Sequence, residues 1–309
     1  MNLIKINNNQ IKNTISKKGV LFIVILGLSL ITTANIQAQS RGIVKRSLTM
    51  KSVELNQDIK YTIYLPSDYA KSNEDYSVFY LLHGFTNNEN TWIDNGWVDI
   101  AEVQGVLENG NDKMIIVMPD GGNSWFVNHP NGKFNYENMF FKEFIPYIES
   151  IYQIKSDRAN RFIGGLSMGG YGALGYTMRH IDMFSVCVAF SSAIRTDENT
   201  LSMTDDDFDY LYGSVYNKNI KDFNRISEHW NLNNPLYLVH QLSDNQLKSV
   251  KWYLSCGDKD YLLDGNIEIN RIFRNRDIPH EFRIEGGHHN WDYWRLNIDD
   301  GLKFISEVK

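Results

Sequence analysis

Short apolar runs of strand length alternate with longer stretches of helical spacing from about residue 42 to the carboxyl terminus. Several short runs are rich in Val, Ile, Tyr and Phe, as buried strands usually are. Such alternation predicts an α/β fold, with a mostly parallel central sheet covered by helices on both faces. The predicted strands are 59–65, 78–82, 114–118, 161–163, 184–190, 250–255 and 281–284, and the predicted helices are 136–152, 168–179, 265–275 and 297–308.

The stretch 195–247 is more polar and interrupts this alternation. We expect it to form a short cap-like insertion over the carboxyl edge of the sheet, where it would shape a substrate site. Its acidic cluster lacks the glycine and terminal glutamate of an EF-hand loop, which favours a solvated helix start capped by Thr204 over a calcium site. The acidic residues are Asp205, Asp206, Asp207 and Asp209.

The amino terminus has the order of a secretory signal. Lys17 and Lys18 precede an apolar run at 20–31, and small residues follow through Ala34 and Ala38. The run is shorter than the ~18 residues that indicate a membrane-spanning helix, so an uncleaved anchor is the weaker alternative. No cysteine follows the run to carry a lipid. We therefore predict a signal peptide at 1–38, one domain at 39–309, no stable membrane insertion after signal removal, and a secreted or periplasmic location.

Charge and cysteine content limit the function classes. The 309 residues carry a net charge of −6, and removing 1–38, which contain four lysines and no acid, would leave −10. An acidic domain of this kind argues against nucleic acid as a partner, because phosphate contacts need clustered Lys and Arg.

Cys187 and Cys256 each lie in an apolar segment of strand type, which predicts two buried thiols and no disulfide framework.

The most informative motif is Gly165-x-Ser167-x-Gly169, which lies between a predicted strand and a predicted helix. Glycines on both sides permit a sharp turn that raises a serine hydroxyl above the sheet edge. The turn also places the Met168 amide at a helix amino terminus, where it would stabilise an oxyanion. The pattern predicts that Ser167 is a nucleophile, whereas a buried serine in a glycine-rich turn is the plain alternative.

A nucleophilic serine needs a base, and the base needs a carboxylate to orient it. Two loops after predicted strands offer these groups. The first contains Asp258 and Asp260, and the second contains His288 and His289. Asp258 and Asp260 compete for the role of the acid, and His288 and His289 compete for the role of the base, and the residues alone do not choose between them.

A third loop follows the strand at 78–82 and begins with His83 and Gly84. The second oxyanion donor of a serine hydrolase usually comes from the backbone of such a loop, and the Phe85 amide is our candidate. We interpret His83 as a residue that braces the loop through backbone hydrogen bonds rather than as a catalytic base.

From residue 45 to the end, the chain resembles the esterase D-like branch of the α/β-hydrolases. This branch includes the feruloyl and acetylxylan esterases of the first carbohydrate esterase family, S-formylglutathione hydrolases and mycolyltransferases. The motifs that carry the resemblance are His83-Gly84-Phe85 with Trp92, Asn123-Ser124-Trp125, the glycine-rich segment 164–174, Cys256-Gly257-x-x-Asp260, and His289-x-Trp291-x-x-Trp294.

The resemblance implies an α/β-hydrolase fold and hydrolysis of carboxylic esters with no cofactor and no metal. It selects His289 over His288 as the base and Asp260 over Asp258 as the acid, beside Ser167 as nucleophile. It also implies that the amides of Phe85 and Met168 form the oxyanion hole.

The substrate is less narrowly defined by the sequence. Trp92, Trp125, Phe126 and Trp291 would suit an aromatic cleft for a hydroxycinnamoyl group or a sugar face, and core packing explains them equally well. Together with the predicted export of the protein, the resemblance implies that it removes feruloyl or acetyl groups from plant cell-wall polysaccharide such as xylan. The alternatives are an acyltransferase, an S-formylglutathione hydrolase-like esterase, and a non-enzymatic domain that binds carbohydrate.

Overall fold

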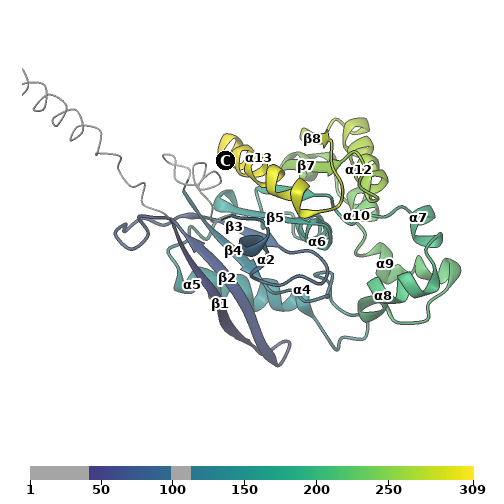
Figure 1. Ribbon diagram of the computed structural model, residues 1–309, viewed down its shortest axis with the longest axis horizontal. Coiled ribbons are helices and arrows are strands. Elements are labelled where there is room, and N and C mark those ends of the chain that lie inside the picture. Colours follow the sequence, from purple (N-terminus) through teal and green to yellow (C-terminus); the bar gives the residue numbers. More distant parts are fainter. Residues whose placement is uncertain (1–41, 99–112) are drawn as a thin grey trace, which may run out of the picture. The chain divides into compact units, whose positions relative to one another are not determined.

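The computed structural model describes residues 42–98 and 113–309, which form a single eight-stranded sheet with helices on both faces (Figure 1). The strand order is β1-β2-β4-β3-β5-β6-β7-β8. β1 and β2 are antiparallel to their neighbours, and β3 to β8 run parallel. The α/β fold with a mostly parallel sheet is therefore confirmed. The strands are β1 (Ile43–Ser52), β2 (Gln57–Leu65), β3 (Ser77–Leu82), β4 (Met114–Pro119), β5 (Arg161–Leu166), β6 (Val186–Phe190), β7 (Lys251–Gly257) and β8 (His280–Glu285).

Successive residues of the central strands enter two separate cores, one on each face of the sheet. In β3, Val78 and Tyr80 pack in the larger core, whereas Phe79 and Leu81 pack in the smaller one. Both sets are fully buried, because a parallel sheet covered on both faces exposes neither side of its strands to water. This burial explains why the central strands are continuous apolar runs in the sequence.

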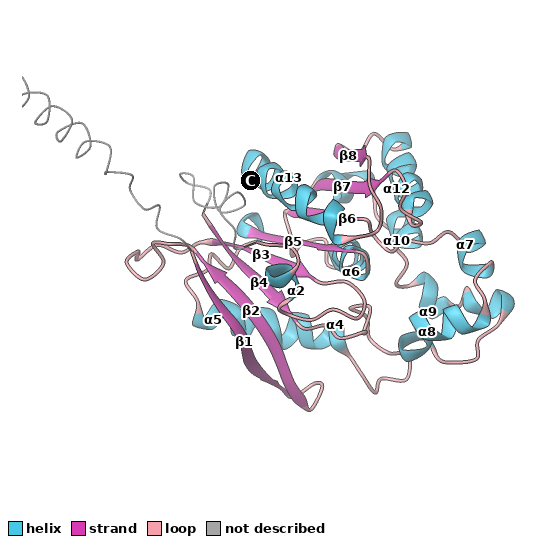
Figure 2. Cartoon of the chain, viewed as in Figure 1, coloured by secondary structure: helices cyan, strands magenta, loops and turns pink. Residues whose placement is uncertain are grey.

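Helices cover the two faces of the sheet (Figure 2). The predicted helix at 136–152 is α4 (Tyr136–Met139), a π-turn (Phe140–Phe144) and α5 (Ile145–Ile151). The other predicted helices are α6 (Met168–Arg179), α12 (Leu263–Asn275) and α13 (Trp291–Val308). Side chains of α6 and α12 join the larger core, and side chains of α13 join the smaller one.

β1 and the short helix α2 (Thr91–Asp94) were not predicted from the sequence. β1 is an edge strand, and most of its residues are exposed or only partly buried, so it lacks the apolar run that marks the central strands. It is held instead by its antiparallel ladder with β2, where Met50 lies opposite Ile59.

The insertion contains five helices and a short 3-10 turn, Asp222–Arg225. Thr204 caps α8 by accepting a hydrogen bond from the Asp207 amide, as predicted. Asp205 pairs with Lys221 and with Arg225, which is a structural role for the acidic cluster. The helices are α7 (Asp197–Leu201), α8 (Asp205–Tyr216), α9 (Glu228–Asn231), α10 (Pro235–Gln241) and α11 (Asp244–Lys248).

Both cysteines are buried free thiols, as predicted. Burial raises the pKa of the Cys187 thiol to about 12, so this thiol stays protonated at neutral pH.

The predicted signal peptide at 1–38 lies outside the described residues, so it remains a prediction. Within 42–98 and 113–309, no helix combines the length and apolar character needed to cross a membrane.

Candidate active site

Ser167 occupies a strained turn between the end of β5 and the start of α6. Its φ and ψ angles are 52° and −118°, a region that side chains other than glycine rarely adopt. A Cβ atom at Gly165 would lie 2.6 Å from the backbone of Gly169, and one at Gly169 would meet the carbonyls of Leu82 and His83. The turn therefore requires both glycines, as the motif predicted.

Two backbone amides lie beside this serine. Met168 is the first residue of α6, and the first amides of a helix have no acceptor within it. Phe85 follows Gly84, and both line the same cleft as Ser167. Within the described residues, neither the Phe85 nor the Met168 amide has a hydrogen-bond acceptor. Both are therefore available to a negatively charged oxygen.

His289 joins Ser167 to Asp260. Its Nε2 atom lies 2.9 Å from the Ser167 Oγ, and its Nδ1 atom lies 2.9 Å from Oδ2 of Asp260. With an ionised Asp260, Nδ1 carries the ring proton and donates a hydrogen bond to the carboxylate. Nε2 is then free to accept the serine proton, which is the orientation a general base needs.

The carboxyl side chain of Asp260 is fully buried. Burial opposes its ionisation, but the hydrogen bonds from His289 and from the Leu262 amide outweigh this effect and lower the pKa of Asp260. The side chain is therefore a buried anion at neutral pH. A buried anion at Nδ1 also favours a positive charge on the His289 ring during proton transfer.

The neighbouring candidates lie elsewhere. Asp258 accepts a hydrogen bond of 2.8 Å from the Gly287 amide, so it joins the two loops rather than orienting the imidazole. The Lys259 amide donates to the Gly287 carbonyl across the same loops. His288 is exposed, and its carbonyl accepts the Asn290 amide. The structure therefore brings Ser167 together with His289 and not with His288.

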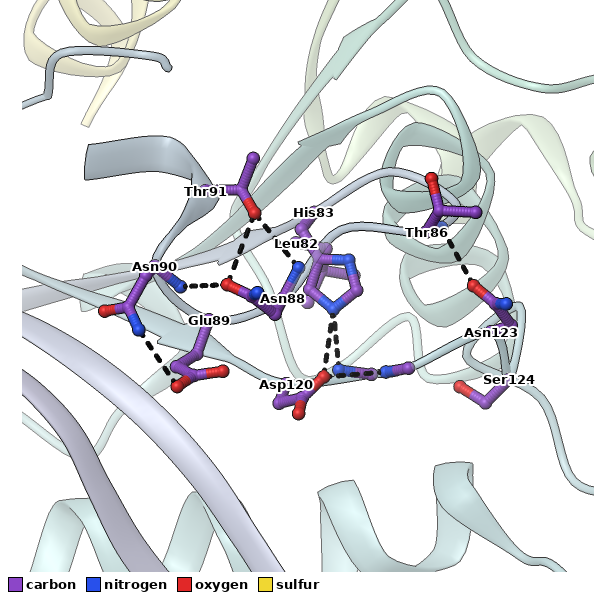
Figure 3. A network of polar contacts seen from close by, with 12 residues as sticks. Leu82, His83, Thr86, Asn88, Glu89, Asn90, Thr91, Asp120, Asn123 and Ser124 are labelled. Atoms are coloured by element: carbon purple, nitrogen blue, oxygen red, sulfur yellow. Dashed lines mark hydrogen bonds and ion pairs between the residues drawn. The ribbon is translucent and has the colours of Figure 1, made fainter. Parts of the chain in front are cut away.

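His83 is buried and holds the loop that carries Phe85 (Figure 3). Its Nδ1 lies 2.7 Å from the Gly84 carbonyl, and its Nε2 accepts a hydrogen bond of 2.8 Å from the Gly121 amide. Further along the loop, the Thr86 amide donates to Oδ1 of Asn123. These contacts agree with the interpretation of His83 as a bracing residue.

A cleft of about 230 Å³ opens beside Ser167 and His289. Trp125 and Trp291 line it, as expected, but Trp92 and Phe126 do not. Trp92 is buried under the cleft, where its indole donates a hydrogen bond to the Leu82 carbonyl at the end of β3. The expectation that Trp92 and Phe126 line the cleft is therefore wrong. Trp92 packs in the smaller core and Phe126 in the larger one.

Several lining residues were not predicted from the sequence. They include Arg195 and Leu211 from the insertion and Tyr261, which directly follows Asp260. Tyr261 could have been predicted to line the cleft, because it directly follows the candidate acid. Arg195 and Leu211 could be assigned only to the insertion, because no local motif shows which residues of a cap face the site.

A larger cavity of about 310 Å³ lies between β2, the loop at 120–124 and α8. Its lining includes Asp58, Lys60 and Tyr136 but no histidine, so it offers no serine and imidazole pair. Among residues 42–98 and 113–309, no group of three or more His, Cys, Asp and Glu side chains is arranged to hold a metal ion.

The strand order, the parallel strands β3 to β8 and the strained serine after β5 define the α/β-hydrolase fold. The chain belongs to the putative esterase family, whose model matches residues 52–305. It is thus an esterase of the serine hydrolase class, and its resemblance to feruloyl and acetylxylan esterases is confirmed.

Individual relatives agree with this assignment. The chain is 33% identical to a ferulic acid esterase of known structure, with a TM-score of 0.72 over 87% of this chain and 98% of that one. It is 27% identical to an acetyl esterase of Caldicellulosiruptor saccharolyticus, over 76% of this chain and 85% of that protein. It is also 27% identical to an esterase of Mycobacterium tuberculosis, over 77% of this chain, but it spans only 54% of that protein's length.

Proposed function

We propose that the protein is an exported serine esterase that removes feruloyl or acetyl groups from plant cell-wall polysaccharide such as xylan. The observation that carries this proposal is the line of hydrogen bonds from Ser167 through His289 to the buried Asp260, next to two open amides. Serine, imidazole and carboxylate in this order are the parts that acyl transfer to a serine requires.

In the first step, Ser167 Oγ attacks the ester carbonyl carbon while its proton moves to Nε2 of His289. The carbonyl oxygen becomes an oxyanion, to which the Phe85 and Met168 amides donate. Asp260 stays ionised because its pKa is lowered, so it stabilises the imidazolium that forms. The bond to the leaving alcohol then breaks, and His289 gives its proton to that oxygen.

The second step removes the acyl group from Ser167. Water loses a proton to Nε2 of His289 and attacks the acyl carbon, which gives a second oxyanion at the same two amides. Collapse of this intermediate returns the proton to Ser167 Oγ and releases the carboxylic acid. Transfer to another alcohol would differ only in which hydroxyl enters the cleft.

Three observations support feruloyl or acetyl as the acyl group that is removed. Similar proteins are a ferulic acid esterase and an acetyl esterase. The cleft is lined by aromatic side chains, which pack well against a hydroxycinnamoyl ring. The predicted signal peptide would bring the enzyme to polymeric substrate outside the cytoplasm.

The test is release of free acid by a chain that starts near residue 40. Methyl ferulate, acetylated xylan and a short aryl ester are the substrates, Ser167→Ala is the test variant, and Ser150→Ala on the exposed end of α5 is the matched control. We expect Ser167→Ala alone to abolish release. Serine-dependent activity on the aryl ester only would contradict the polysaccharide assignment. Transfer of the acyl group to an added alcohol without release of acid would identify an acyltransferase.

A further inference from the structure

The cleft beside Ser167 is lined by a positive charge but by no negative one. Arg195 is the one permanently charged side chain among its lining residues, and no carboxylate lines it. Asp260 lies behind His289, with a side chain that is fully buried. A substrate in the cleft therefore meets a cation that the cleft itself does not neutralise.

Arg195 is held in place through only one of its nitrogen atoms. Its Nε donates a hydrogen bond of 3.2 Å to the Tyr212 hydroxyl, and its guanidinium lies 5.9 Å from the centre of the Tyr261 ring. A guanidinium has five N–H donors, and no described residue accepts from Nη1 or Nη2 of Arg195. No described carboxylate pairs with it either, in contrast to Arg161 and Arg179.

The other walls of the cleft are mostly apolar. Phe85, Trp125, Leu211 and Tyr261 line it with Arg195, and the cleft holds about 230 Å³. Such walls suit the faces of an aromatic ring, whereas an acetyl group would leave most of the space filled with water. A ring seated there would exclude water from the guanidinium as well.

We propose that Arg195 is a specificity-determining residue that donates hydrogen bonds to an oxygen substituent on the ring of an aromatic acyl group. The inference rests on the proposed esterase function and narrows it to hydroxylated or methoxylated ring acids. A ring with such an oxygen replaces the water on Nη1 or Nη2. A bare ring leaves these donors unpaired, and sites built to bond a polar group reject analogues that lack it.

The experiment compares kcat/KM for three methyl esters that differ only in ring oxygens: ferulate, p-coumarate and cinnamate. Arg195→Met keeps an unbranched side chain that ends at the position of Nε and removes every donor, and Arg274→Met on the exposed face of α12 is the matched control. We expect Arg195→Met to lower the ratio of ferulate to cinnamate by about 10-fold or more, since hydrogen bonds to charged groups are worth that much. Arg274→Met keeps the original ratio.

The p-coumarate arm identifies which oxygen Arg195 contacts. If Arg195→Met lowers kcat/KM for both ferulate and p-coumarate, Arg195 contacts the ring hydroxyl. If it lowers kcat/KM for ferulate alone, Arg195 contacts the methoxy group. An equal loss on all three esters, or an unchanged ratio, overturns the proposal. Tyr212→Phe provides a second variant should Arg195→Met not fold, because it removes only the hydroxyl that fixes Nε, and it is expected to lower the same ratio by a smaller factor.

Two further outcomes separate this proposal from the proposed function. Serine-dependent hydrolysis of acetyl esters but of none of the three aromatic esters keeps the esterase and overturns the role of Arg195. Without any turnover, binding of methyl ferulate and methyl cinnamate to the Ser167→Ala variant is measured instead. Tighter binding of ferulate that disappears with Arg195→Met supports the proposal independently of catalysis, and equal binding of the two esters overturns it.

Discussion

The Nε2 atom of His289 lies 2.9 Å from the Oγ atom of Ser167, although the two residues are 122 positions apart in the sequence. Ser167 directly follows β5, and His289 follows β8 after a short loop. Because β5 and β8 run parallel in one sheet, their carboxyl ends lie at the same edge, and the residues after them meet there. The contact thus depends on the order and direction of the strands, and two residues of the triad, His289 and Asp260, each have a neighbour of the same type that serves as a control.

His289 and its neighbour His288 form the first matched pair. We expect His289→Ala to lower kcat for a short aryl ester by about 10³-fold or more, because Ser167 then has no base. His288→Ala should leave kcat close to that of the unmodified protein, since its side chain is exposed. Steady-state kinetics with circular dichroism as a folding control measure both. The reverse result would assign the base to His288.

Asp260 and Asp258 form the second pair. Asp260→Asn should lower kcat by about 10³- to 10⁴-fold, because an amide at this position allows the wrong imidazole tautomer. Asp258→Asn keeps an oxygen that accepts the Gly287 amide, so we expect only a small change. Kinetics of the two variants under identical conditions decide the matter. A dead Asp258→Asn beside an active Asp260→Asn would show that the acid is Asp258.

The backbone of the serine turn leaves no space for a side chain at Gly169. Gly169→Ala would push a methyl group into the carbonyls of Leu82 and His83, which cannot rotate away. We expect a loss of about 1–3 kcal/mol in the free energy of unfolding, and lower activity because the same segment leads to Phe85. Urea denaturation measures the loss. Gly286→Ala is the control, because no atom lies within 4 Å of its added Cβ, and equal stability of the two variants would contradict the argument.

Glu137 is expected to make stability depend on pH. Burial opposes its ionisation, but the ion pair with Arg179 and the hydrogen bond from His180 outweigh this and lower the pKa of Glu137. A carboxyl whose pKa is lower in the folded state stabilises fully above its unfolded value of 4.5, and this contribution disappears as the pH falls through the folded value.

Glu137→Gln should therefore lower the free energy of unfolding by about 3 kcal/mol at pH 7, because the mostly buried Arg179 loses its carboxylate partner. The difference from the unmodified protein should shrink on acidification below pH 4.5. Urea midpoints at several pH values measure it, with the exposed Asp182→Asn as control. A difference that stays constant from pH 7 to the acid transition would refute the linkage.

Trp125 and Trp92 are expected to respond differently to truncation. Trp125 lines the cleft and donates to the Leu211 carbonyl, so Trp125→Ala should raise KM for methyl ferulate. Trp92→Phe should leave KM unchanged and lower the free energy of unfolding by about 1–3 kcal/mol, since it removes a buried hydrogen bond and leaves a small cavity. A raised KM in Trp92→Phe would restore this residue to the substrate site.

Local signals in the sequence were sufficient for the framework of the fold and for the serine turn. The central strands are continuous apolar runs because they are buried on both faces, and α6 was predicted at its observed bounds. Gly165 and Gly169 mark the turn because only glycine fits against the neighbouring backbone. Each of these features is set by residues close together in the chain, so the sequence alone determines them.

Features set by contacts between distant segments required the tertiary structure. The residues alone left His288 beside His289 and Asp258 beside Asp260, and the choice in the sequence rested on the family resemblance. The folded loops give its physical reason, because they place His289 against Ser167 and Asp260 against His289. Trp92 is an aromatic residue of the kind that lines a cleft, yet as part of α2 it is buried in the smaller core. Arg195 carries no motif, and it lines the cleft because the loop after β6 leaves the sheet next to Ser167, where the Ala193 amide donates to the Ser167 carbonyl. The type of a side chain limits the environments in which it is stable, and the packing of distant segments determines which of those environments it occupies.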